Sequence, residues 1–590
     1  MSEKFEPTGF SAEIFKSRYA FTEDETWEEA CKRVAKQVAI VEIPDKVKKY
    51  EDKFYDVLIT NRFVPGGRIW YGSGRPNPQL LNCFVLNSDL DSKEGWGNIS
   101  REMIITSMAG GGCGIDFSDV RPRGSNIKGH RGTCPGSVEL MKLLNGNGKP
   151  VKAGGHRRVA QMFSLDLNHP DIIEFLDSKL KNGELDLANI SVKCKNTSKF
   201  IEAVKNNGDW ELSWKGQYKK TIKAKYLWDI IVKNAYNSAE PGFLNWELAL
   251  SENNIYYIED LVTANPCGEI VMSSYDACDL GHLVLPRFII DGDVDWHLLA
   301  STIRTSVRFL DNIIDISKFP LPEMKDKTNK LRRIGLGTTG LADTLVLLGY
   351  KYGSKEGNEF IDKLYRFISK IAYESSVMLA IEKGPFPLCN PEQHIKSGYI
   401  KRMTKKVKDL ILEHGIRNCA LLTQAPTGTV SILSGNCSSG IEPIFAPAYE
   451  RRYWENDNRK MELVFHPIFA KFMKEKKDIS SFIFAKDLSV KDHMEVQKII
   501  QKHIDNAVSK TINIPEKYSI KDMSNIWLEY LPFLKGATFF RENSRDYIDE
   551  NGNLQEPPLK AVSISEAKKR FKDNYKETNI IDCNTGACEL

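Results

Sequence analysis

The sequence predicts an α/β fold. Segments in which apolar residues recur at helical spacing alternate with short apolar runs of the length expected for buried strands. Helical periodicity marks residues 226–236, 296–316, 338–350 and 356–384, and the short apolar runs include 280–290 and 419–424. Alternation of this kind is typical of a sheet covered by helices.

The chain begins with a region of helical character. Thr26 is a candidate helix cap, and apolar residues recur at helical spacing among many charges after it. These apolar residues are Trp27, Ala30, Val34, Val38 and Ile40. We therefore predict an N-terminal helical region over residues 1–60, followed by the α/β unit over residues 61–545.

Two local patterns refine this outline. A helix containing Val138–Met141 is expected to end at a turn over Asn145–Gly148, because asparagine and glycine favour turns. Within residues 196–226, the alternation around Asn206–Asp209, with Trp210 and Trp214, predicts a hairpin.

The C-terminal segment differs in character from the rest of the chain. From about residue 546 the periodicity is lost and the sequence becomes polar, with Pro557-Pro558 and many lysines. Such a composition is typical of a flexible tether. We predict a flexible tail over residues 546–590, which carries Cys583 and Cys588 close to its end.

Composition limits the possible functions. The 82 Lys and Arg residues against 78 Asp and Glu residues leave a net charge of +4, which argues against a protein devoted to binding nucleic acid. The twelve cysteines are too sparse for a disulfide scaffold and form no CxxC zinc motif, so we predict no metal site and a reducing, cytoplasmic location. The sequence contains no apolar run near the roughly 18 residues that a membrane span requires.

The most informative stretch is Asn265-Pro266-Cys267-Gly268-Glu269, which places an amide, a thiol and a carboxylate at alternate positions. Alternate residues of an extended segment share one face. Pro266 disfavours a helix at its neighbour and Gly268 relaxes the backbone, so we predict a tight extended loop that presents the three groups together. A free cysteine is also a common core residue, and the motif alone leaves that interpretation open.

Two more thiols accompany this trio. Cys278 follows eleven residues after Cys267, and Cys83 lies far upstream in Leu81-Asn82-Cys83-Phe84-Val85-Leu86. Three thiols and one acid together suggest redox chemistry on a substrate.

The order of motifs along the chain resembles the catalytic subunit of ribonucleotide reductases, and among them most closely the class II, adenosylcobalamin-dependent kind. The resemblance runs from about residue 10 to the C-terminus. Its segments are Arg62–Arg68, Asn82–Leu86, Gly110–Ser118, His169–Phe175, Asn189–Val192, Asn265–Glu269, Arg332–Gly337, Ala425–Ser431, Ser439–Pro443 and the closing cysteine pair.

The resemblance implies a fold and an activity. The fold is a ten-stranded α/β barrel built from two five-stranded halves, with Cys267 on a loop through its centre. The activity is the conversion of ribonucleotides, as diphosphates, to 2′-deoxyribonucleotides for DNA synthesis. The ATP-binding cone that many of these enzymes carry at the N-terminus needs more residues than precede Arg62, so we expect none.

The resemblance also assigns roles to the thiols and their neighbours. A thiyl radical on Cys267 would remove the 3′-hydrogen of the ribose, while Glu269 acts as a base toward the 3′-hydroxyl. Asn265 would hold the ribose hydroxyls. Cys83 and Cys278 would supply a proton and electrons and end as a disulfide, which Cys583 and Cys588 of the tail would reduce by thiol exchange with a thioredoxin- or glutaredoxin-like partner.

Two binding loops are carried over in the same way. The family's substrate-phosphate loop matches Pro426, Thr427, Gly428, Thr429 and Ser431, where hydroxyls and backbone N–H groups suit an anionic diphosphate, and Asn82 would also contact the substrate.

The second loop concerns regulation. A loop that senses a deoxynucleoside triphosphate effector matches Gly154, Gly155, His156, Arg157 and Arg158, with a second subunit of a homodimer completing the site. Val159 stands where the family usually has glycine.

The origin of the radical separates the classes. A class I subunit receives it through two adjacent tyrosines late in the chain, where this sequence has Phe539-Phe540, and Tyr256-Tyr257 precedes Cys267. This favours adenosylcobalamin as cofactor. The alternatives are a class I catalytic subunit with a separate radical-generating partner, a glycyl radical enzyme, whose Arg-x-x-Gly-Tyr segment we do not find, and a nucleotide-binding regulator that has lost catalysis.

Overall fold

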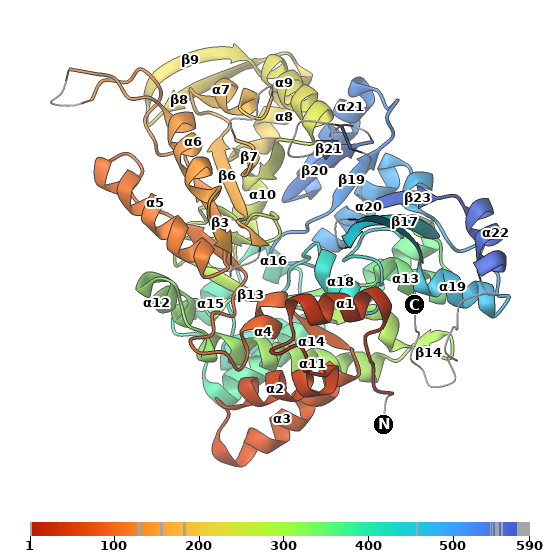
Figure 1. The fold of residues 1–590 in the computed structure, drawn as a ribbon. Coiled ribbons are helices and arrows are strands. Elements are labelled where there is room, and N and C mark those ends of the chain that lie inside the picture. Colours follow the sequence, from red (N-terminus) through yellow and green to blue (C-terminus); the bar gives the residue numbers. More distant parts are fainter. Residues whose placement is uncertain are drawn as a thin grey trace.

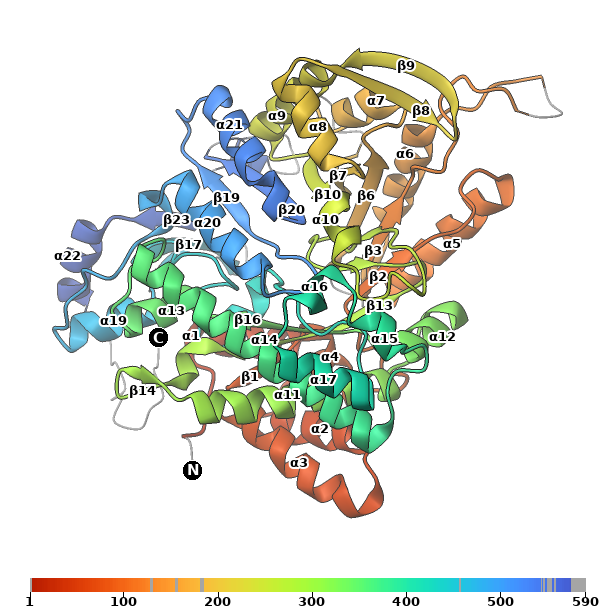
Figure 2. The same cartoon turned by 180° about the vertical axis from the view of Figure 1, so that it is seen from behind.

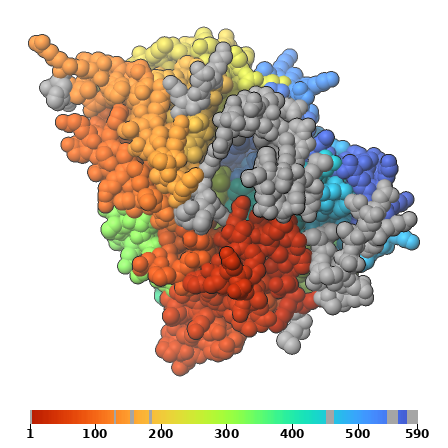
Figure 3. Space-filling model, in the orientation of Figure 1, coloured from red at the N-terminus to blue at the C-terminus, as the bar shows by residue number. Residues whose placement is uncertain are grey.

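A computed structural model of the chain describes residues 3–574, except for 128–130, 154–156, 181–184, 456–457, 543, 545–546, 549–553 and 556–558. Helices at the N-terminal end lie at the base of the view in Figure 1, and the strands of a large sheet lie above them. Figure 3 draws this face as a solid surface, on which the N-terminal segment, in red, forms one continuous block.

The predicted N-terminal helical region is confirmed. It contains α1 (Gly9–Arg18), α2 (Trp27–Ala39) and α3 (Pro44–Ile59), with α4 (Gly67–Gly72) directly after it. Thr26 caps α2, since its hydroxyl accepts the Glu29 N–H while the Glu29 carboxylate accepts the Thr26 N–H. The indole of Trp27, fully buried, lies 4.7 Å from that of Trp70 and ties α2 to α4.

The α/β class is also confirmed, and its centre is a ten-stranded sheet. In spatial order the strands are β1 (Phe63–Pro65), β13 (Ala277–Val284), β2 (Cys83–Leu86), β3 (Gly112–Asp116), β6 (Gln161–Asp166), β7 (Asn189–Cys194), β10 (Gly242–Asn245), β20 (Gly536–Arg541) and β19 (Thr511–Ile514), while β16 (Ile334–Thr339) pairs with β13.

Strand direction divides this sheet into two parts. β2, β3, β6, β7 and β10 are parallel to one another and form the first half. β13 is parallel to β16, and β19 is parallel to β20, so these four strands form the second half. The tenth strand, β1, pairs antiparallel with β13 and belongs to neither half. The two halves meet in antiparallel pairs at β13–β2 and at β10–β20.

The sheet does not close as a continuous ladder. The run 419–424, predicted as a strand, makes only isolated bridges, from Leu422 to Leu336 of β16 and from Gln424 to Val508, which precedes β19. These bridges are both parallel, and they join the two edges of the second half. The predicted closed barrel is therefore not found as such in the described residues.

Helices cover the outer surface of each half, as Figures 1 and 2 show from opposite sides. α5 (Lys93–Met108), α6 (Ser137–Gly148), α9 (Ala224–Ser238) and α21 (Ile520–Tyr530) share a core with the first half. A second core joins β13 and β16 of the second half to α11 (Trp296–Ile316), α14 (Lys355–Lys383), α17 (Lys405–His414) and the N-terminal helices, whereas β19 and β20 contribute to the first core. α11 has the bounds predicted from its periodicity, and those of α14 differ by one residue at each end.

Four local predictions differ from the structure. The segment 338–350, predicted as helical, begins inside β16, and its helix α13 spans only Leu341–Leu347. Residues Asn145–Gly148 continue α6 instead of forming a turn. The hairpin is present as β8 (Asp209–Trp214) and β9 (Gln217–Lys223), but it turns at Lys215 and Gly216, both with positive φ, and Asn206 ends the preceding helix α8 (Thr197–Lys205). Within the predicted tail, β23 (Leu559–Val562) pairs with β17 (Ala448–Glu455), and α22 (Ile564–Asn574) packs beside it.

Partners distant in sequence explain the last difference. Phe571 of α22 packs edge-on against Phe465 at 5.4 Å, a contact that a periodicity search cannot detect. None of the helices that the structure describes has the length and apolar character to cross a membrane.

Candidate active site

The Asn265–Glu269 stretch forms the turn of a short hairpin between β11 (Thr263–Ala264) and β12 (Val271–Met272). The Gly268 N–H donates to the Asn265 carbonyl at 2.9 Å, which closes a β-turn with Pro266 at its second position. Gly268 then takes φ 78°, where a side chain would be strained. The prediction of an extended segment is thus wrong in detail. A turn brings the three groups together, and the alternation of side chains along a strand plays no part.

The first half of the sheet holds one side of this hairpin by close backbone approach. A Cβ at Gly114 of β3 would lie 2.0 Å from the Ala264 carbonyl oxygen, and one at Gly112 would lie 3.0 Å from Cγ of Pro266. Only glycine allows this contact. Asn189 of β7 also donates its side-chain N–H to the Pro266 carbonyl at 3.1 Å.

A buried network of charged and polar side chains also holds the hairpin against the first half of the sheet. The Lys193 ammonium contacts the Asp116 carboxylate at 2.6 Å and the Val262 carbonyl at 3.2 Å. Asp116 accepts from the hydroxyl of Ser164 at 2.7 Å, and that hydroxyl lies 2.7 Å from the hydroxyl of Thr263. The network therefore links both strands β3 and β7 to the start of the hairpin. Sequence reasoning missed it; only Asp116, inside the Gly110–Ser118 motif, gave any signal.

The second half of the sheet holds the other side. The Glu269 carbonyl accepts the Ala507 N–H at 2.8 Å and the Thr423 hydroxyl at 2.7 Å. Both donors belong to the segments that bridge β16 to the residues before β19. The hairpin therefore spans the space between the two halves.

Cys83 and Cys278 lie directly opposite each other where β2 pairs with β13. Opposed residues of an antiparallel pair have Cα atoms about 4.5–5.5 Å apart, within the range that a disulfide bridges. Both side chains are buried, and all ten cysteines of the described residues are free. The sequence-predicted pair is thus brought together.

Asn265 connects this pair to the hairpin. Its side-chain N–H donates to Sγ of Cys83 at 3.1 Å, while its side-chain oxygen accepts the Ile270 N–H at 3.0 Å. Burial, and then the charges of Glu269 and Cys267, raise the pKa of Cys83 well above its usual range. Burial, and then the charge of Asp279, do the same for the pKa of Cys278.

Glu269 has the environment of a poised base. Its side chain is buried, and Oε2 has no hydrogen-bond partner among the described residues. Burial raises the pKa of Glu269 to about 7, opposed by a hydrogen bond from Asn265. A carboxyl with a pKa near neutrality can accept or donate a proton at little cost.

Cys267 is exposed, but the surface that it exposes faces a cavity of about 320 Å³. The cavity is lined by the hairpin, by residues of β7, β10 and β20, and by Val508–Thr511. The surrounding protein, and then the Glu269 charge, raise the pKa of Cys267. The thiol therefore remains protonated at neutral pH while it stays accessible.

The predicted phosphate loop lies at the edge of this cavity. Pro426 lines it, and Thr427 adopts φ 57° before the short helix α18 (Gly428–Leu433). The Thr427 hydroxyl accepts the Gly440 N–H at 2.6 Å, and the Ser431 hydroxyl lies 2.8 Å from that of Ser439, so both hydroxyls hold the loop itself. Gly428 is exposed and Thr429 is half-buried.

The remaining predicted residues divide into two groups. Asn82 lies beside Cys83, where its N–H donates to the Cys278 carbonyl at 3.0 Å, and its side-chain oxygen has no hydrogen-bond partner within the described chain. Arg157 and Arg158 form the short strand β5. Five predicted residues lie outside the described residues, namely Gly154, Gly155, His156, Cys583 and Cys588. No group of three or more His, Cys, Asp or Glu residues suited to a metal ion occurs in the described part.

Comparison with known proteins places this site in a family. The family model of the ribonucleotide reductase barrel domain matches residues 81–531, and that of the all-alpha domain of ribonucleotide reductase matches residues 5–78. The chain belongs to the ribonucleotide reductase family. The resemblance found in the sequence is thereby confirmed over most of its length.

Individual ribonucleotide reductases agree with this assignment. The chain is 31% identical to a vitamin B12-dependent ribonucleoside-diphosphate reductase of Thermoplasma acidophilum, over 92% of this chain and 72% of that protein. It is 30% identical to the protein of the same name from Mycobacterium tuberculosis, over 90% and 79%. A ribonucleoside-diphosphate reductase large subunit of variola virus is 28% identical, over 68% and 57%.

Proposed function

We propose that this ribonucleotide reductase is a cytoplasmic, adenosylcobalamin-dependent enzyme that converts ribonucleoside diphosphates to 2′-deoxyribonucleoside diphosphates for DNA synthesis. The observation that carries the proposal is the hairpin turn, which exposes Cys267 to a cavity while Asn265 donates a hydrogen bond to Cys83 of the buried pair. The reaction that we assign to this arrangement begins with a thiyl radical at Cys267.

The first step is removal of the ribose 3′-hydrogen atom by Cys267. This step needs a thiol that can lose a hydrogen atom and regain it, which the protonated and accessible Cys267 provides. Glu269 accepts the proton of the 3′-hydroxyl through its unpartnered oxygen, and its pKa of about 7 suits that task. Asn265 orients the ribose hydroxyls.

The buried pair completes the reduction. One thiol of Cys83 and Cys278 protonates the 2′-hydroxyl, which leaves as water, and the pair supplies two electrons and the hydrogen that replaces it. The ribonucleotide and two thiols thus give the deoxyribonucleotide, one disulfide and water. Finally, Cys267 returns the 3′-hydrogen. The opposed strand positions of the pair allow the disulfide to form without movement of the backbone.

The proposed barrel gives this chemistry its shelter. We infer that the two parallel halves, joined at one side by β10 and β20 and at the other by β13 and β2, are the two five-stranded halves of a ten-stranded barrel. The fifth strand of the second half is the segment around Leu422 and Gln424. A closed sheet around the hairpin would keep water from the radical.

The residues around Cys267 suit the cofactor that two relatives carry in their names. The cavity has room for a nucleoside-sized group, and Gly242, Ala537, Thr538 and residues 508–511 would hold it. When bound, adenosylcobalamin supplies the oxidising equivalent that converts the Cys267 thiol to a thiyl radical. Phe540, which lines the same cavity, has no phenol to relay a radical from elsewhere.

The tail and the effector loop complete the proposal. We assign reduction of the internal disulfide to Cys583 and Cys588, which would exchange with a thioredoxin- or glutaredoxin-like protein. We assign control of substrate choice to a deoxynucleoside triphosphate bound near residues 154–158 in a homodimer.

The decisive experiment is turnover of the purified chain on ribonucleoside diphosphates with a dithiol reductant. We expect deoxynucleotide with adenosylcobalamin and none without it. Product only with an added radical-generating subunit would instead support the second candidate, a class I catalytic subunit, which the similarity to the variola virus large subunit favours. No product under any of these conditions would refute the proposed activity.

A further inference from the structure

A second cavity, of about 890 Å³, shares no lining residue with the cavity at Cys267 and lies on the helical side of the second half. It lies between α14, α17 and α16 (Gly398–Lys401), and the helices that form it are on the face drawn in Figure 2. Its volume is within the range of sites that bind small molecules. We call it the cationic cavity, and its lining is Trp296, Lys363, Arg366, Phe367, Ser369, Lys370, Tyr399, Arg402, Met403, Thr404, Val407, Lys502 and His503.

The charge of this lining is one-sided. It contains the cations Lys363, Arg366, Lys370, Arg402 and Lys502 and no carboxylate, in a chain whose whole net charge is +4. Arg366 and Lys502 pair with Asp362, and Arg402 pairs with Glu252. Lys363 and Lys370 form no ion pair within the described residues. Cations that outnumber their partners attract an anion.

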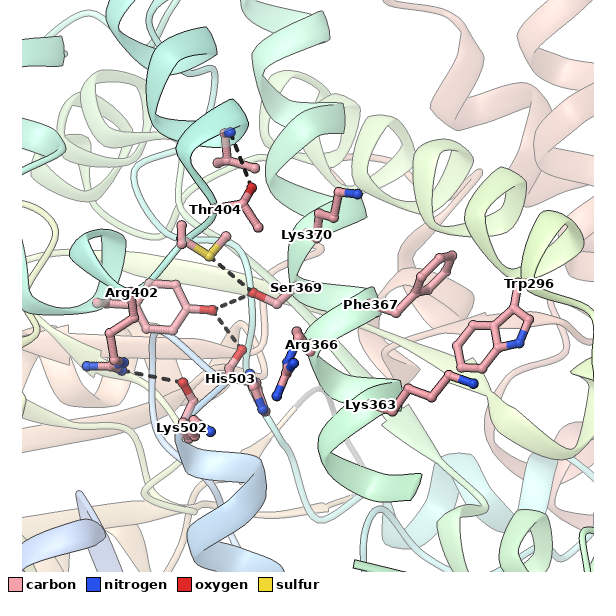
Figure 4. Close-up of a pocket in the computed structure, with 13 residues that line it drawn as sticks. Trp296, Lys363, Arg366, Phe367, Ser369, Lys370, Arg402, Thr404, Lys502 and His503 are labelled. Atoms are coloured by element: carbon pink, nitrogen blue, oxygen red, sulfur yellow. Dashed lines mark hydrogen bonds between the residues drawn. The ribbon is translucent and has the colours of Figure 1, made fainter. Parts of the chain in front are cut away.

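The remainder of the lining is apolar and aromatic. The rings of Trp296 and Phe367 meet edge to face with centroids 4.8 Å apart, and the Lys363 ammonium lies 4.9 Å from the Trp296 ring centroid. Figure 4 shows Trp296, Phe367 and Lys363 at one end of the cavity and Arg402, Lys502 and His503 at the other. A ligand that fits both features has a flat ring and several anionic oxygens.

A hydrogen-bonded segment connects the cationic cavity to the catalytic hairpin. Lys502 and His503 line the cationic cavity, the Ala507 N–H donates to the Glu269 carbonyl, and Val508–Thr511 line the cavity at Cys267. The segment 502–511 therefore lines the cationic cavity at its first end and the cavity at Cys267 at its other end.

Asp505 holds the middle of this segment. It accepts the N–H groups of Leu421 and Leu422, each at 2.8 Å, and the hydroxyl of Tyr373 at 2.6 Å. Tyr373 packs on Tyr399 of the cationic cavity with ring centroids 5.7 Å apart, and the Tyr399 hydroxyl donates to the His503 carbonyl at 2.7 Å. Tyr399 and His503 thus belong to a continuous set of contacts that includes Asp505.

We propose that the cationic cavity binds a nucleotide carrying a polyphosphate, with its base against the aromatic end and its phosphates on the lysines and arginines, and that this binding alters residues 502–511. Arginine and lysine are the common partners of phosphate groups. The binding claim does not depend on the proposed function, whereas an effect on turnover would rest on it.

Equilibrium binding of ATP to the full-length chain tests the site, with the fluorescence of Trp296 as a local signal. We expect ATP to quench a component of fluorescence that is absent in Trp296→Phe. The double variant Lys363→Glu and Lys370→Glu should weaken this binding at least tenfold, and inorganic tripolyphosphate and adenosine should each bind at least tenfold more weakly than ATP.

A matched double variant controls for net charge. Lys199→Glu and Lys233→Glu change two exposed lysines on α8 and α9, and they should leave the quenching unchanged. Equal weakening by the two double variants, or quenching that persists in Trp296→Phe, would overturn the proposed site. Binding elsewhere on the chain, including at residues 154–158, would not respond to Trp296.

Amide hydrogen exchange tests the connection. ATP should slow exchange at residues 504–511 in the native chain and leave it unchanged in the Lys363→Glu, Lys370→Glu variant. Quenching by ATP without any change in exchange over these residues would refute the coupling, whatever the outcome for turnover.

Discussion

Cys267 and the pair of Cys83 and Cys278 are fixed in different ways. The pair is fixed by the backbone, because its members are opposed residues of β2 and β13. Cys267 is fixed by a turn that glycines of the first half and hydrogen bonds from the second half hold in place. This difference fits the roles that we propose, because two thiols that form a disulfide need a constant separation, whereas a thiol that reacts with a ligand needs access.

The pKa values of the three thiols are consistent with the roles that we propose for them. Burial raises the pKa of Cys83 and Cys278, and the surrounding protein with the Glu269 charge raises that of Cys267, so each thiol retains its hydrogen at neutral pH. A protonated thiol can give up a hydrogen atom, but it is a poor nucleophile. High pKa values thus fit the role in substrate reduction that we propose for the buried pair, and they agree with our proposal that the tail cysteines carry out thiol exchange.

The largest effect should come from Cys267→Ser. A serine hydroxyl cannot take the place of a thiyl radical, so activity should fall by roughly 10⁴-fold or more, the scale on which loss of a reacting group acts. Stability should change little, because Cys267 is exposed to the cavity. Cys389→Ser, at a half-buried cysteine two residues before α15 (Pro391–His394), is the control in the same turnover assay. Activity within tenfold of the native chain would exclude Cys267 as the reacting thiol.

Glu269→Gln should have the next largest effect. Removal of a general base costs about 10²- to 10⁴-fold in kcat. The native enzyme should lose activity as the pH falls through about 7, because the base works only when it is unprotonated. The variant should lack this acidic limb in a pH profile of kcat. An unchanged limb in Glu269→Gln would assign the limb to another group.

Gly114→Ala separates the two thiol sites. The new Cβ would lie 2.0 Å from the Ala264 carbonyl oxygen, so the hairpin must move, and a shift of about 1 Å can cost roughly 10²-fold in rate. The β2–β13 pairing should persist, so oxidation of the purified chain should still link Cys83 to Cys278. Gly146→Ala in α6, where the added atom meets nothing within 4 Å, is the matched control. Loss of the disulfide in Gly114→Ala would show that the sites are not independent.

Glu269 also makes the stability depend on pH. Its folded-state pKa of about 7 exceeds the ordinary value of 4.5, so the folded chain binds the proton more tightly and loses stability as the pH rises from 4.5 through 7. The loss should reach about 3 kcal/mol at pH 8. The melting temperature of Glu269→Gln should therefore rise relative to that of the native chain between pH 5 and pH 8. A constant difference between the two would contradict the raised pKa.

Local sequence predicted those elements whose cause is local. Thr26 and Glu29 form the cap of α2 by themselves, and the apolar stripe of α11 gives its bounds. The candidate trio could also be proposed from the sequence, since Asn265, Cys267 and Glu269 lie within five residues. The turn that arranges them was not predicted, although Pro266 and Gly268 are its local signal. The packing of the hairpin against β3 depends on Gly112 and Gly114, some 150 residues upstream, and leaves no local pattern.

Contacts between distant segments account for the remaining differences. The run 419–424 has the composition of a strand, yet its neighbours β16 and residue 508 meet it at single positions. Lys193 and Asp116 lie 77 residues apart, so their ion pair leaves no pattern in either segment. In the same way, the polar residues around Phe571 predict a flexible tail, although in the structure Phe571 packs against Phe465.

A single-turnover experiment tests the division between the thiol sites most directly. The double variant Cys583→Ser and Cys588→Ser is reduced, freed of reductant, and mixed with adenosylcobalamin and a ribonucleoside diphosphate. We expect one deoxynucleotide per chain and, by peptide mapping, one new disulfide between Cys83 and Cys278, with Cys267 still a thiol. Deoxynucleotide formed while Cys83 and Cys278 remain reduced, or a disulfide that contains Cys267, would contradict the account.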